Sequence, residues 1–151
     1  DMITGMVSDN ARYDVFGLVD KALHGDTKSA VKCLHGLRNE GTDGITILWA
    51  LAREIRTLLQ VCHTINQGKH FDWAAKKAGV WDQRKGVIQI ALRRNNEMQL
   101  QLLLRKANAV DKTIKGARNA DVWDELLDLT LNLCGIYSLQ PKNQKLSLTL
   151  N

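Results

Sequence analysis

The only dense group of acidic residues lies near the C-terminal end of the sequence and comprises Asp121, Asp124, Glu125 and Asp128. On a helix, three of these carboxylates would share one face, and oxygen ligands of this kind suit a magnesium ion. Acids at a helix start are also common because they accept hydrogen bonds from free backbone amides and face the positive end of the helix dipole. We therefore favour helix capping over a metal site for this cluster.

Histidine and cysteine are arranged without the spacing of a metal or nucleophile site. The four histidines form no HxxxH pair, and no cysteine lies four positions from a histidine. Cys62 and His63 are adjacent, so on a helix their side chains diverge by about 100° and cannot work as nucleophile and base. Neither GxGxxG nor GxxxxGK[ST] occurs. We expect no catalytic residues, no metal and no cofactor.

Tryptophan is the remaining residue type that could carry binding. Trp49 and Trp123 lie on apolar helical stripes, which predicts core packing. Trp81 lies in an expected helix-start loop next to Arg84 and Lys85. This position suits either a hydrophobic staple over the next helix or an anchor for a partner, and both readings stay open.

The elements that must position these residues are predicted to be helices. Apolar residues recur at helical spacing over about 14–23, 26–40, 42–66, 71–78, 82–95, 100–115 and 121–134. In the first segment the stripe is assigned to Phe16, Val19, Asp20 and Leu23; in the third it is assigned to Ile45, Leu48, Trp49, Ala52, Ile55, Leu59 and Cys62. The sequence holds one proline in 151 residues, which also favours helix. We predict an all-α, compact multi-helix bundle of about seven helices.

The ends of the chain are expected to differ from this bundle. The chain begins with Asp1 rather than methionine, so we expect a processed product or a cut-out fragment. We predict the helical domain over 11–137 and a loose C-terminal tail over 138–151, where Leu146, Leu148 and Leu150 alternate too briefly to indicate a strand. No apolar run is long enough for a membrane span, and three cysteines without short spacing fit a reducing cytosol.

Positive charge is concentrated in the second half of the chain. The net charge is +5, but residues 67–118 carry twelve Lys or Arg against four Asp or Glu, which leaves the rest of the chain at −3. Such a segment is most often a solvated helix face, which is the interpretation we favour. The alternative is contact with an anionic partner such as nucleic acid.

The order of several short motifs resembles one known family. The motifs are Phe16 to Asp20 (FGLVD), Ala30 to Gly41 (AVKCLHGLRNEG), Leu48 to Glu54 (LWALARE), Val80-Trp81 with Arg84, Ala91 to Arg94 (ALRR), Asp111 to Lys115 and Val122 to Leu126 (VWDEL). Together, over about residues 9–136, they resemble the C-terminal part of the bacterial DNA polymerase III delta subunit. Two departures are Gly44, where the family has proline, and Cys33, where an aliphatic residue is usual.

The resemblance implies a fold and a role. It implies a helical collar domain of the clamp loader, which joins equivalent domains of the gamma or tau and delta-prime subunits and, through the full assembly, acts on the sliding clamp and primed DNA. It further implies an ATPase-like domain and a helical lid upstream, with residues 1–10 as the lid's remnant or a linker, and a cytoplasmic, non-catalytic chain within the polymerase holoenzyme. We predict a subunit interface at Trp81, Arg84, Arg93 and Arg94, whose charge and aromatic content exceed the needs of a core. The alternatives are a basic helical nucleic-acid-binding domain or an unrelated helical adaptor. No membrane or small-molecule substrate is expected.

Overall fold

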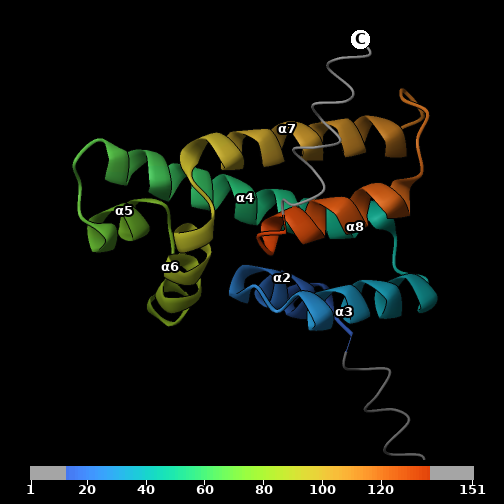
Figure 1. Cartoon of the computed structure of the whole chain (residues 1–151), viewed down its shortest axis with the longest axis horizontal. Coiled ribbons are helices and arrows are strands. Elements are labelled where there is room, and N and C mark those ends of the chain that lie inside the picture. The colour runs from blue at the N-terminus through green and yellow to red at the C-terminus, as the bar shows by residue number, and fades with distance from the viewer. Residues whose placement is uncertain (1–12, 137–151) are drawn as a thin grey trace, which may run out of the picture.

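The computed structural model describes residues 13–136, and every regular element in that range is helical (Figure 1). The elements are α2 (Val15–His24), α3 (Thr27–Asn39), α4 (Gly44–Asn66), α5 (Phe71–Lys77), the short 3₁₀ helix η1 (Asp82–Arg84), α6 (Lys85–Arg94), α7 (Glu97–Ile114) and α8 (Val122–Leu133). This confirms the predicted all-α bundle. The predicted C-terminal tail and the assignment of residues 1–10 lie outside the described residues.

The longest helix, α4, is the centre of the bundle. It packs along α7, and it also contacts α2, α5, α6 and α8. In Figure 1, α7 runs along one side of α4. The hairpin of α2 and α3 lies on the other side of α8 from α7. In Figure 1 the short helices α5 and α6 lie toward the same end of the molecule; α5 packs mainly on α4, whereas α6 packs mainly on α2.

Polar residues at the helix starts explain several of the boundaries. Asp26 accepts a hydrogen bond from the Ser29 amide at the start of α3, and Asn96 and Gln99 form a reciprocal capping box at the start of α7. At the start of α8, Asp121 accepts hydrogen bonds from the Trp123 and Asp124 amides, each at 3.0 Å. The first member of the acidic cluster is therefore a helix cap, as the sequence indicated.

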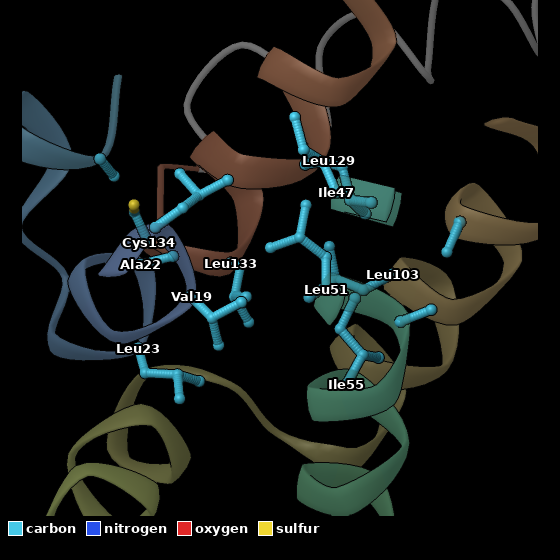
Figure 2. Close-up of a cluster of buried hydrophobic side chains, with 14 of the residues drawn as sticks. Val19, Ala22, Leu23, Ile47, Leu51, Ile55, Leu103, Leu129, Leu133 and Cys134 are labelled. Atoms are coloured by element: carbon cyan, nitrogen blue, oxygen red, sulfur yellow. The ribbon is translucent and has the colours of Figure 1, made fainter. Parts of the chain in front are cut away.

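The core is built mainly from aliphatic side chains of α2, α3, α4, α6, α7 and α8, several of which Figure 2 shows together. From α4 it takes Ile47, Leu51 and Ile55, all fully buried. The α4 start also lies close to α8. A Cβ atom on Gly44 would sit 3.1 Å from Val122 Cγ1, so glycine suits this contact.

The predicted inner faces of two helices are wrong in part. In α4, Leu48, Ala52 and Ile55 are buried as predicted, and Ile47, Leu51 and Leu58 complete the buried face. Trp49 points away from this face, and 64% of its surface is exposed. In α2, Val19 and Leu23 are buried as predicted, but Phe16 is 79% exposed, and Leu18 and Ala22 complete the buried face. Both helices carry apolar residues on more than one side, so spacing alone did not identify the core face.

Trp123, by contrast, matches its predicted place. It is partly buried, packs against the core, and has the Arg38 guanidinium carbon 5.4 Å from its ring centroid.

Candidate interface groove

Three of the exposed aromatic side chains line one groove of about 800 Å³. Phe16 comes from α2, Trp49 from α4, and Trp81 from the segment between α5 and η1, where it is 71% exposed. Side chains of small or medium size, including Val15, Ala50 and residues 78–80, complete the apolar part of the lining. A groove with three exposed aromatic rings is an unusual surface for an isolated protein and typical of a contact site.

The segment that carries Trp81 is fixed by a tight turn. Gly79 follows α5 with a φ of 78°, a left-handed conformation that favours glycine, and the Val80 amide donates a hydrogen bond to the Ala75 carbonyl. Trp81 then directly precedes η1. The high exposure of Trp81 argues against the staple reading and favours the interface reading.

Arg84 lines the groove and forms two ion pairs with neighbouring helices. One guanidinium nitrogen, Nη1, lies 2.9 Å from Asp20 Oδ1 of α2, and the other, Nη2, lies 2.9 Å from Glu54 Oε1 of α4. Burial alone would lower the pKa of Arg84, but the hydrogen bonds to Glu54 and Asp20 outweigh it, and the net shift is upward. Arg84 therefore lines the groove and at the same time links η1 to both helices.

The other two predicted interface residues lie elsewhere. Arg93 is exposed on α6, and neither Arg93 nor Arg94 lines the groove. Arg94 turns inward: its Nη2 donates to the Leu23 carbonyl at 2.6 Å and to the Leu133 carbonyl at 3.5 Å. It thus joins the C-terminal ends of α2 and α8, where a positive charge is favoured by the helix dipoles.

Two groove residues, Phe16 and Trp49, were missed because they were assigned to core stripes. A signal for them exists in the sequence. Helix α4 has more apolar positions than one buried face can hold, so some of them must face outward. Which ones do so depends on the neighbouring helices.

The basic segment over 67–118 consists partly of cations with carboxylate partners. Lys85 lies 3.5 Å from Asp72 and 3.2 Å from Asp82, Lys115 pairs with Asp111, and Lys106 and Arg118 pair with Asp128 and Glu125. These bridges support the interpretation of the segment as a solvated helix surface. Two acids of the cluster noted in the sequence, Glu125 and Asp128, are therefore engaged in ion pairs.

Lysines on and before α5 have a different environment. Lys69 Nζ lies 5.0 Å and Lys77 Nζ 5.2 Å from the centroid of the Trp73 ring, which is 49% exposed. Both ammonium groups are thus within cation–π distance of an aromatic ring on the molecular surface.

No catalytic arrangement emerges among the described residues. Within 13–136 no group of three His, Cys, Asp or Glu side chains could hold a metal ion, and no helix is long and apolar enough to cross a membrane. Cys62 and His63 have separate partners: Asn66 Nδ2 lies 3.9 Å from Cys62 Sγ, and His63 Nδ1 lies 3.0 Å from Glu97 Oε2. Burial raises the pKa of the Cys33 and Cys134 thiols, as expected of unreactive core cysteines.

Comparison with known proteins agrees with the resemblance seen in the motifs. Residues 12–129 match the family described as DNA polymerase III delta subunit, C-terminal domain. The DNA polymerase III subunit delta of Escherichia coli K12 is 34% identical over 130 residues, which are 85% of this chain and 37% of the relative. That of Haemophilus influenzae is 24% identical over 144 residues, covering 87% of this chain and 41% of the relative. The chain thus spans about two fifths of the length of these relatives.

Proposed function

Because this chain belongs to the family of DNA polymerase III delta subunits, through their C-terminal domain, we propose that it is the assembly domain of a clamp-loader delta subunit. In this role it joins the C-terminal domains of neighbouring subunits, gamma or tau and delta-prime, in the cytoplasm. The complete assembly opens the sliding clamp and delivers it to primed DNA. The domain itself contributes binding surface and rigidity rather than chemistry.

The single structural observation that supports docking of a neighbouring subunit is the groove with Phe16, Trp49 and Trp81 along it. Exposed rings of this size cost solvation free energy in water, and their burial by a partner supplies the largest favourable term in association. The occupant we propose is a helix from the C-terminal domain of a neighbouring clamp-loader subunit. An apolar stripe on such a helix would fit between α2 and α4.

The packing behind the groove supports the same role. Arg84 ties α2, α4 and η1 together through Asp20 and Glu54, so the three walls of the groove keep a fixed spacing. A surface that is already ordered loses less conformational entropy when a partner binds. This suits a permanent subunit contact.

The test is complex formation with the gamma or tau subunit of the same organism, followed by size-exclusion chromatography with light scattering. The double variant F16A/W49A should fold normally, because both side chains are exposed, and should weaken the complex at least tenfold, since buried aromatic anchors are typical hot spots. W81A should have an effect in the same direction.

The matched control removes exposed apolar side chains from another helix. Met98 and Leu102 of α7 are 70% and 42% exposed and do not line the groove. M98A/L102A should leave the complex intact. A complex lost in this variant but retained in F16A/W49A would show that the partner docks on α7 instead.

A further inference from the structure

We propose that Tyr13, whose ring lies on Gly36 of α3, is a positioning residue that holds Phe16 at the groove for the partner subunit. The inference rests on the proposed function, since it assigns a residue that acts on the docking site from outside it. Tyr13 does not line the groove, whereas the next three residues, 14–16, all do. The contact with Gly36 thus immediately precedes, along the chain, the part of α2 that lines the groove.

The Tyr13 ring packs against the backbone of α3 at a position that only glycine allows. A Cβ atom on Gly36 would lie 2.6 Å from Cγ and Cδ2 of Tyr13 and 2.8 Å from Cδ1, well inside normal carbon–carbon contact distance. These atoms are at the root of the ring rather than at its tip, so the whole side chain would have to move to make room. Tyr13 is partly buried and packs against the core. Alanine at position 36 would therefore displace it.

The next residue, Asp14, is tied to the same helix and also caps α2. Its carbonyl oxygen accepts a hydrogen bond from Cys33 Sγ at 3.6 Å, and Cys33 lies about one turn before Gly36 on α3. The same carbonyl accepts from the Leu18 amide at 3.1 Å, and the Asp14 carboxylate accepts from the Gly17 amide. The start of α2 is thus joined to α3 at two consecutive positions.

The first turn of α2 has little local support of its own. It contains Gly17, which weakens a helix relative to alanine, and it has no acidic residue inside the turn. Phe16 is 79% exposed, so few contacts of its own side chain fix it. The fully buried residues of α2 begin only at Leu18, and Val15 before it is partly buried. The position of Phe16 therefore depends on how the chain is anchored before the helix, which is where Tyr13 acts.

An anchored first turn favours docking because less order has to be created on binding. Fixing the backbone of one residue costs the equivalent of a roughly 5- to 30-fold change in an equilibrium constant. A partner that meets a loosened turn must order it again and loses that part of its affinity.

The anchoring itself is tested by amide hydrogen exchange of the full chain, resolved by NMR. In G36A and Y13A the amides of Gly17 and Leu18 should exchange faster, because both donate to Asp14 and its anchor to α3 is released. Y13F keeps the ring and should match the parent chain. G86A is the matched control, since a Cβ atom added to Gly86 of α6 meets nothing within 4 Å. Unchanged exchange in G36A and Y13A would overturn the proposal.

The effect on docking is measured as the affinity for the gamma or tau subunit. G36A should weaken the complex roughly 5- to 30-fold and no more than F16A does, whereas G86A should leave it unchanged. Because Tyr13 acts through Phe16, F16A/G36A should bind as weakly as F16A and not more weakly. Losses that add up in the double variant would contradict the positioning role.

The results separate this inference from the docking proposal. Gly36 is not among the buried residues of α3, so G36A should keep the circular dichroism of the parent chain. Faster exchange in G36A with an unchanged complex, while F16A/W49A still loses the complex, would overturn the role of Tyr13 and leave the groove as the docking site. A complex that F16A/W49A does not weaken would contradict both proposals, because Phe16 would then have no partner to be positioned for.

Discussion

At the scale of single residues, Arg84 connects two helices of the domain. Its guanidinium contacts carboxylates from two helices that are far apart in the chain, Asp20 and Glu54. Glu54 has only 16% of its side chain exposed, so loss of its partner would leave a poorly solvated charge.

We expect R84M to lower the free energy of unfolding by about 1–2 kcal/mol, a value reduced from that of a fully buried pair because Arg84 itself is partly solvated. Chemical denaturation monitored by circular dichroism measures this difference. R93M is the matched control, since Arg93 is exposed on α6, and it should change stability far less. Equal losses in the two variants would mean that the bridges to Asp20 and Glu54 contribute nothing.

At the same scale, sequence reasoning found part of the candidate site. Trp81 and Arg84, two of the four residues predicted to form a subunit interface, line the groove. Arg94 was assigned to an interface from its charge, but it donates to carbonyls at two helix ends inside the molecule. Charge in a sequence does not tell a surface arginine from one that caps a helix, because the capped helix lies about 70 residues away in the chain. Arg93 stays a candidate, outside the groove.

At the scale of elements, start signals were the most informative part of the sequence. The seven predicted segments correspond to α2 through α8. The segment predicted over 82–95 begins with the 3₁₀ helix η1 and continues as α6. Capping side chains and terminal glycines are local signals, so they can be read without knowledge of the fold. The sequence does not predict which faces of α2 and α4 are buried, because this depends on where α6, α7 and α8 pack against them.

The two aspartates that precede α4 and α8 allow a direct test of capping. Asp121 accepts hydrogen bonds from two amides of α8, whereas Asp43, before α4, makes no capping hydrogen bond with its side chain. D121A should therefore destabilise the domain by about 1 kcal/mol, and D43A should cost clearly less. Thermal unfolding of the two variants beside the parent chain measures both. A D121A variant as stable as the parent chain would mean that Asp121 does not cap α8 in solution.

At the scale of the whole molecule, binding features are divided between two surfaces. Apolar aromatic rings gather between α2, α4 and the turn after α5, while Lys69 and Lys77 lie close to the exposed Trp73 ring at α5. The first surface has the composition expected of a contact with a neighbouring protein. Neither could be assembled from the sequence alone, because each of them requires the positions of helices that the chain brings together only on folding.

The central claim is that a neighbouring clamp-loader subunit docks in the aromatic groove. The most direct measurement places a photo-reactive phenylalanine analogue at position 49 or, as a control, at position 98, and then irradiates the complex with the gamma or tau subunit. Position 49 lines the groove and position 98 lies on α7 outside it. We predict an efficient cross-link to the partner from position 49 and little from position 98. A cross-link from position 98 with none from position 49 would contradict the account.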